Sequence, residues 1–140
     1  MKVKFCGAAQ FVTGSSHLIT LDDGYKILLD CGLFQGAEIS GTGATKDKLE
    51  IDFPISHIKA LVVTHVHIDH VGRIPYLLAA GFSGPIICSE PSAALLPLVL
   101  EDALKVGVTR NAQFIKKFLK VLKQKIIAVP YSKNYKIAPG

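Results

Sequence analysis

The chain has 140 residues and a mass of 15.1 kDa, which suits one domain or part of a larger one. Its 49% hydrophobic and 19% charged residues exclude global disorder, and no apolar stretch approaches the roughly 20 residues that span a membrane. Residues 1–102 carry 7 Lys and Arg against 11 Asp and Glu, whereas residues 103–140 carry 9 Lys and Arg and no acid, so the C-terminal region suits either a polyanion partner or a solvated helix face.

The first part of the chain predicts β-structure. Residues 3–5 form a first expected strand, and residues 16–21 and 25–29 form an expected hairpin around an Asp-Asp-Gly turn at 22–24. Residues 36–50 are rich in Gly, Ser, Thr and mixed charge, which predicts a loop.

Strands and helices alternate from residue 58 onward. The apolar, β-branched run 58–63 predicts a buried central strand, and a polar loop is expected over 64–70. The later expected elements are helices over 74–80, from 89 or 92 to about 105 and over 113–125, and strands over 85–88, 126–129 and 135–138. Pro97 is expected to kink the second of these helices unless it lies in the first turn. The whole pattern predicts an α/β fold with a mixed β-sheet and flanking helices.

The cysteines and the N-terminus indicate the compartment. Three cysteines without CxxC spacing predict neither a disulfide framework nor a thiolate zinc cluster. The N-terminus lacks the apolar run of a signal peptide. We therefore expect a cytoplasmic location.

The segment that follows the predicted central strand carries the clearest chemistry. His65, His67 and His70 are three of the five histidines of the chain, and Asp69 lies among them. An extended backbone places His65 and His67 on one side. Imidazole nitrogens and carboxylate oxygens are suitable zinc ligands, so these four residues are candidate ligands of two neighbouring metal ions. Such a pair would lower the pKa of a shared water and stabilise charge on the attacked group.

Other residues near this segment are weaker candidates. Asp69 could also act in catalysis by orienting the attacking hydroxide. Asp30, at the end of a predicted strand, could orient the histidines from behind, or it could be a simple turn residue. His17 could support the site or be structural. Arg73 could contact a substrate phosphate or form a structural contact, and His57 is expected at the surface.

The sequence resembles a known family at these residues. The run His65-x-His67-x-Asp69-His70 resembles the metal motif of the metallo-β-lactamase superfamily. Three flanking segments look like signatures of its RNA-processing β-CASP branch: residues 7–17 (GAAQFVTGSSH), 29–36 (LDCGLFQG) and 69–77 (DHVGRIPYL). The resemblance covers about residues 3–138.

The resemblance implies a fold and an activity. It implies an αββα sandwich and zinc-dependent hydrolysis of RNA phosphodiester bonds by a metal-bound hydroxide. On the family pattern, His65 and His67 bind the first of two zinc ions, Asp69 and His70 bind the second, and Asp30 supports the site.

The sequence also departs from the family pattern. That pattern includes a further histidine, a bridging aspartate and a late histidine downstream, together with an inserted β-CASP domain, and His17 and His57 precede the metal motif instead. We therefore expect residues 1–140 to be the N-terminal part of a metallo-β-lactamase domain with an incomplete metal site. The rest of the domain, or a second copy, would then be needed to cover the sheet, and RNA would be the partner of the full-length protein.

Two other functions remain open. One is a different hydrolase of the superfamily that acts on an ester or thioester. The other is a non-catalytic binding or assembly module with a partial metal site. The basic helix over 113–125 could contact RNA, rest on an anionic membrane surface or simply pack on the sheet, its lysines being Lys116, Lys117, Lys120 and Lys123.

Overall fold

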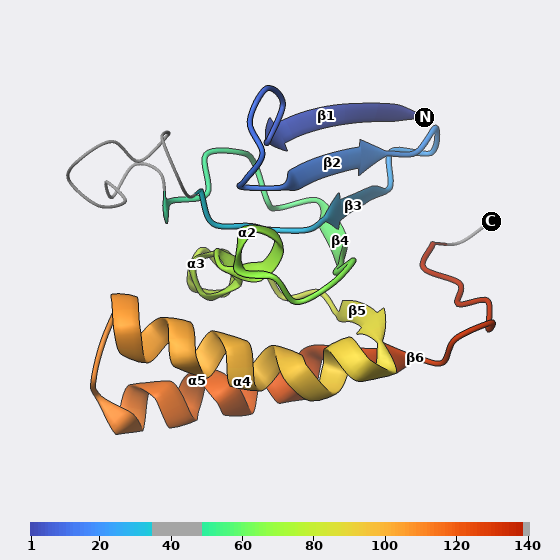
Figure 1. The fold of residues 1–140 in the computed structure, drawn as a ribbon. Helices are drawn as coiled ribbons and strands as arrows, with labels where there is room; N and C mark the ends of the chain where they lie inside the picture. Colours follow the sequence, from blue (N-terminus) through green and yellow to red (C-terminus); the bar gives the residue numbers. More distant parts are fainter. Residues whose placement is uncertain (35–48, 139–140) are drawn as a thin grey trace.

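The computed structural model describes residues 1–34 and 49–138. In this part of the chain, six strands form one sheet and lie side by side in the order β1 to β6 (Figure 1). Their bounds are β1 Lys2–Gly7, β2 Ser16–Thr20, β3 Lys26–Leu29, β4 Ile58–Val62, β5 Ile86–Ser89 and β6 Ile126–Val129. The pairs β1–β2 and β2–β3 are antiparallel, and the pairs from β3 to β6 are parallel. The predicted α/β fold with a mixed sheet is therefore confirmed.

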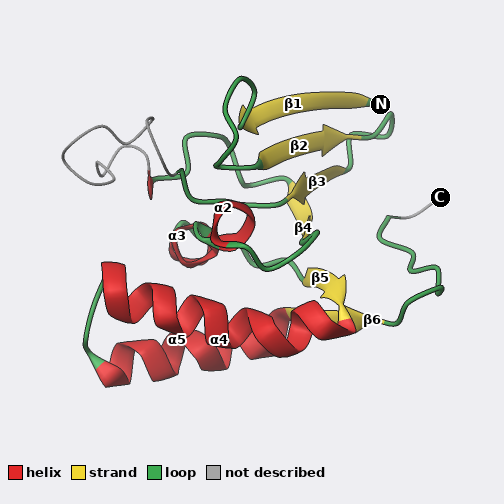
Figure 2. Cartoon of the chain, viewed as in Figure 1, coloured by secondary structure: helices red, strands yellow, loops and turns green. Residues whose placement is uncertain are grey.

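The helices follow the parallel strands. They are α2 Ile68–Val71, α3 Ile74–Ala79, α4 Glu90–Gly107 and α5 Ala112–Lys125. The side chain of Ser89 accepts a hydrogen bond from the Ser92 amide at the start of α4, and Asn111 caps α5 in the same way. Helices α4 and α5 run side by side, and α4 packs on β5 and β6 (Figure 2).

Three predicted elements differ from the structure. The polar loop expected over 64–70 contains the single helical turn α2. Residues 135–138 form no strand; instead, the Tyr25 hydroxyl donates a hydrogen bond to the Ile137 carbonyl. Helix α4 continues through Pro97 to Gly107, beyond the expected end near residue 105. The loop expected over 36–50 lies largely outside the described residues, since only its last two residues are within them.

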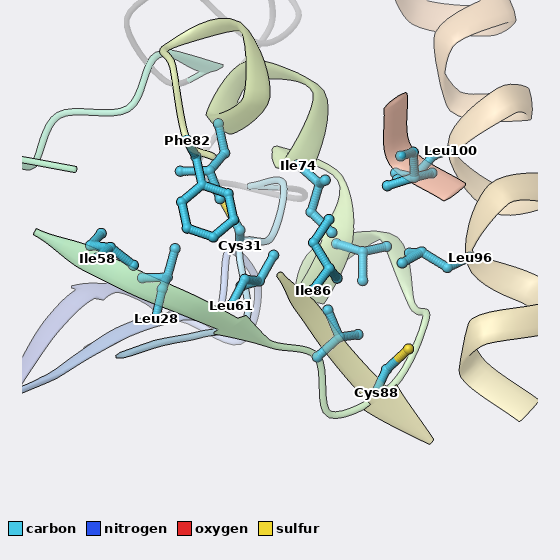
Figure 3. Close-up of a cluster of buried hydrophobic side chains, with 14 of the residues drawn as sticks. Leu28, Cys31, Ile58, Leu61, Ile74, Phe82, Ile86, Cys88, Leu96 and Leu100 are labelled. Carbon is cyan, nitrogen blue, oxygen red and sulfur yellow. The ribbon is translucent and has the colours of Figure 1, made fainter. Parts of the chain in front are cut away.

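The core lies between the sheet and the helices. Leu28, Leu61 and Ile86 of three adjacent strands are completely buried, and they belong to one cluster with Ile74 and Leu96 of the helices (Figure 3). Alternate residues of a strand point to opposite faces, and the helical residues repeat every three to four positions, so both patterns direct apolar side chains into this layer.

The cysteines and the lengths of the helices can also be compared with the sequence analysis. All three cysteines are free, as predicted. Among the described residues, no helix has the length and apolar character needed to cross a membrane.

Candidate metal centre

The histidine cluster lies where β4 ends. The chain leaves β4 in an extended conformation and turns into α2 at His67, whose φ and ψ are −63° and 145°. The ring centroids of His65 and His67 are 4.6 Å apart, and those of His65 and His70 are 4.0 Å apart. Because β3 and β4 are parallel, the residue after β3 reaches the same edge. The structure therefore brings the three predicted imidazoles together at the C-terminal edge of the sheet.

Asp30 lies behind this cluster and is 2% exposed. Its Oδ2 atom is 2.8 Å from Nδ1 of His70, and its Oδ1 atom accepts a hydrogen bond of 2.8 Å from the backbone amide of Thr64. A carboxylate accepts hydrogen bonds, so Nδ1 of His70 is the donor in this contact and Nε2 is the ring nitrogen that faces away from Asp30. The arrangement is the one that orients a metal-binding histidine.

Asp69 lies on the opposite side of the His70 ring. Its Oδ2 atom is 3.5 Å from Nε2 of His70, and both side chains are 22% exposed. Nε2 and the Asp69 carboxylate therefore face the same partly open space, whereas Nδ1 faces the buried Asp30.

Thr64 and Ser15 belong to the site although the sequence analysis did not select them. The Thr64 hydroxyl lies 2.9 Å from Oδ2 of Asp30 and 3.0 Å from Nδ1 of His65, so it joins the two residues. The Ser15 hydroxyl lies 3.4 Å from Oδ2 of Asp30. Ser15 lies within residues 7–17 and Thr64 directly precedes His65, so both could have been selected from their position in or beside the segments that carry the family resemblance.

The backbone of the metal motif is held by two other segments. The Ser15 amide donates to the Asp69 carbonyl at 2.9 Å, and the Cys31 amide donates to the His70 carbonyl at 2.8 Å. The Gly32 amide in turn donates to the Ser15 carbonyl at 2.8 Å. A Cβ atom at Gly32 would collide with the Asp69 carbonyl, so only glycine allows this close approach. We call the meeting of Ser15, residues 31–33 and residues 68–73 the junction.

The thiol of Cys31 takes no part in the site. Burial raises its pKa to about 12, which outweighs the lowering effect of the nearby Arg73 charge. A neutral, buried thiol is neither a nucleophile nor a metal ligand.

The donor set fits zinc by its chemistry, since it combines three imidazoles with a carboxylate. The rings, however, stand at interplanar angles of 70° and 49° to that of His65. Within residues 1–34 and 49–138, no group of three or more His, Cys, Asp or Glu side chains converges on one point as metal ligands do. The candidate ligands are therefore gathered at one end of the sheet but do not form such a group in the described part of the chain.

The remaining candidates lie elsewhere. His17 is in β2, where its ring meets that of Phe5 edge-on at a centroid distance of 5.1 Å, and its buried Nδ1 has no hydrogen-bond partner in the described part of the chain. Arg73 is 1% exposed and points into the protein, which favours its structural interpretation over a phosphate contact. His57 is exposed, as expected.

The family follows from comparison with known proteins. Residues 9–132 match the model of the metallo-beta-lactamase superfamily. The chain belongs to this superfamily. The family's fold agrees with the mixed sheet and flanking helices described above, and the predicted membership of this superfamily is confirmed.

The relatives of the chain indicate the branch. It is 42% identical over 106 residues to Ribonuclease TTHA0252 of Thermus thermophilus, covering 76% of this chain and 23% of that protein. It is 36% identical over 118 residues to cleavage and polyadenylation specificity factor subunit 3-II of Arabidopsis thaliana, covering 76% and 18%. It is 29% identical over 143 residues to Integrator complex subunit 11 of Gallus gallus, covering 92% and 22%. These are β-CASP nucleases, so the resemblance to that branch is confirmed. The chain spans about a fifth of the length of these relatives.

Proposed function

We propose that this chain is the N-terminal part of the metallo-β-lactamase domain of a zinc-dependent ribonuclease that hydrolyses RNA phosphodiester bonds. The observation that carries the proposal is the 2.8 Å contact between Asp30 and Nδ1 of His70, which leaves Nε2 directed toward the open side of the histidine cluster. Two of the relatives are a ribonuclease and a cleavage and polyadenylation specificity factor subunit, which supports RNA as the substrate class. A cytoplasmic protein that acts on RNA fits the same proposal.

Each residue of the cluster has a role in this function. His65 and His67 would hold one zinc ion, and Asp69 and His70 would hold the second. Bound zinc would supply Lewis acidity and lower the pKa of the water that attacks phosphorus. Asp30 and Thr64 would orient His70 and His65 through their contacts of 2.8 and 3.0 Å with the Nδ1 atoms of these rings.

The remaining ligands would come from outside these 140 residues. The chain spans about a fifth of the length of the β-CASP relatives, which leaves room for them in a longer protein. On this proposal, the chain alone binds zinc weakly and cleaves RNA little.

A second candidate function is a non-catalytic binding or assembly module. It is favoured by the observation that no three potential ligands in the described residues converge on a single point. The two candidates differ in what happens when the domain is complete, because only the ribonuclease would then cleave RNA.

The test measures zinc binding by calorimetry and RNA cleavage with a labelled oligonucleotide. Wild-type chain is expected to bind zinc, and His67→Ala is expected to bind it at least about tenfold more weakly. The matched control is His57→Ala, which removes an exposed imidazole away from the cluster and should leave the affinity unchanged. Equal affinities of all three proteins would overturn the assignment of the metal site. Zinc binding without RNA cleavage in a protein whose domain is complete would favour the non-catalytic module.

A further inference from the structure

Arg73 carries a buried charge with no carboxylate partner among residues 1–34 and 49–138. It lies between α2 and α3, and its side chain is 1% exposed. No ion pair joins it to an Asp or Glu among the described residues, and its buried Nη2 atom has no hydrogen-bond partner there. Burying a guanidinium group is costly unless its hydrogen bonds are well made. The bonds that Arg73 does make therefore indicate what its burial achieves.

Those bonds reach backbone and aromatic groups in two segments, the residues that follow β3 and Glu50. Nε of Arg73 donates to the Gly32 carbonyl at 2.7 Å, and Nη1 donates to the Glu50 carbonyl at 3.4 Å. The guanidinium carbon lies 4.9 Å from the ring centroid of Phe34. A planar guanidinium can donate in two directions while its face lies on an aromatic ring, which a lysine ammonium cannot reproduce.

The segment that Arg73 holds is the one that lies on the metal motif. The Cys31 and Leu33 amides donate to the carbonyls of His70 and Ile68 at 2.8 and 3.0 Å. The Arg73 amide closes the contact by donating to the Cys31 carbonyl at 2.9 Å. Gly32, whose carbonyl receives Nε, lies directly against the Asp69 carbonyl. Residues 31–33 are thus fixed between Arg73 on one side and the backbone of 68–70 on the other.

We propose that Arg73 is a positioning residue for Asp69 and His70. Its guanidinium fixes residues 31–33, which in turn fix the backbone that carries these two ligands. Asp30, the residue before this segment, contacts Nδ1 of His70, so residues 30–33 support both the backbone and one side chain of the motif. A role of Arg73 in zinc binding rests on the function proposed above. Its effect on residues 31–33 and on the backbone of 68–70 does not.

The first test uses the metal-free chain and amide hydrogen exchange. In Arg73→Lys, the amides of Cys31 and Leu33 are expected to exchange at least about tenfold faster, because a lysine cannot hold the Gly32 carbonyl in the same way. The Val63 amide, which donates to Ile87 within the sheet, is the internal reference and should not change. Arg110→Lys is the matched control, since Arg110 is exposed. Unchanged or uniformly faster exchange in Arg73→Lys overturns the proposal.

The second test compares zinc affinity well below the melting temperature of each protein. Arg73→Lys is expected to bind zinc about tenfold more weakly than wild type and Arg110→Lys. If wild type binds zinc and folded Arg73→Lys binds it equally well, Arg73 does not position the ligands. If wild type binds no zinc, the proposed function fails, and the exchange of Cys31 and Leu33 alone decides the role of Arg73.

A measurement on wild type covers the case in which Arg73→Lys does not fold. The Nε proton of Arg73 is expected to exchange far more slowly than that of Arg110, because it is buried in a 2.7 Å hydrogen bond. Equal exchange of the two Nε protons would show that no such fixed bond exists in solution, and the proposal would be wrong.

Discussion

The junction and the β1 edge of the sheet differ in how far their side chains are buried. At the junction, backbone amides and carbonyls of three segments satisfy one another, and the side chains of Asp30 and Arg73 are almost completely buried. Along β1, Val3 and Phe5 are 46% and 61% exposed, although both are apolar. The chain therefore builds the support of its metal motif from its own residues but leaves its first strand with little cover. Small substitutions at the junction should therefore lower the free energy of unfolding strongly, whereas substitutions in β1 should change it little.

The largest expected effect is that of Gly32→Ala. The added Cβ would collide with the Asp69 carbonyl, and no flexible side chain can give way there. We expect a loss of more than about 4 kcal/mol in the free energy of unfolding, or no folding at all, because two backbone segments would have to separate. Urea denaturation measures this loss.

Gly107→Ala is the matched control for this substitution. Gly107 lies at the end of α4, and a Cβ there meets nothing within 4 Å. Replacing glycine by alanine in a helix is expected to be neutral or to stabilise by about 0.5 kcal/mol. Equal losses in the two variants would contradict the view that the junction depends on close backbone approach.

The second prediction compares the centre of the sheet with its edge. Leu61 in β4 is completely buried, so Leu61→Ala is expected to cost about 3 kcal/mol through lost burial and a cavity. Val3→Ala in β1 is expected to cost less than about 1 kcal/mol, because the side chain is already 46% exposed. Denaturant midpoints of both variants provide the measurement. A loss at Val3 as large as that at Leu61 would show that β1 is covered in solution.

Local patterns predicted most of the fold, and tertiary contacts account for what they missed. The run 58–63 predicted β4, and the amphipathic pattern over 113–125 predicted α5 to within one residue. The turn α2 was missed because its four residues are too few to show a helical pattern. It is held instead by hydrogen bonds from residues 31–33, which are far away in the chain.

The candidate site likewise combines features that local sequence predicted with features that depend on tertiary contacts. The spacing of His65, His67 and His70 predicted which side chains gather, since a strand end and a following turn fix it locally. The orientation of these side chains depends on Asp30 and Thr64, a pair brought together by the parallel pairing of β3 with β4. The burial of Arg73 could not be read from its position after the motif, because the Gly32 carbonyl that it binds is 41 residues away.

The smallest predicted effect concerns the thiols of the two regions and leaves the fold intact. Burial raises the pKa of Cys31 in the junction to about 12 and, to a smaller extent, that of the partly exposed Cys6 in β1. Both thiols are therefore mainly protonated at pH 8, but only Cys6 is accessible to a reagent. We expect a thiol-reactive dye to label Cys6 within minutes and Cys31 only on unfolding, which peptide mass spectrometry can distinguish.

The raised pKa of Cys31 predicts that the free energy of unfolding falls as the pH rises above about 9. An unfolded cysteine ionises near pH 9.0, whereas folded Cys31 keeps its proton to about pH 12, so its contribution is complete below pH 9.0 and is lost as the pH rises toward 12. Cys31→Ala is expected to weaken the fall in the free energy of unfolding over this range, whereas Cys6→Ala should change it little. Labelling of native Cys31 as fast as that of Cys6 would mean that the junction opens readily, and the contrast between the two regions would then not hold.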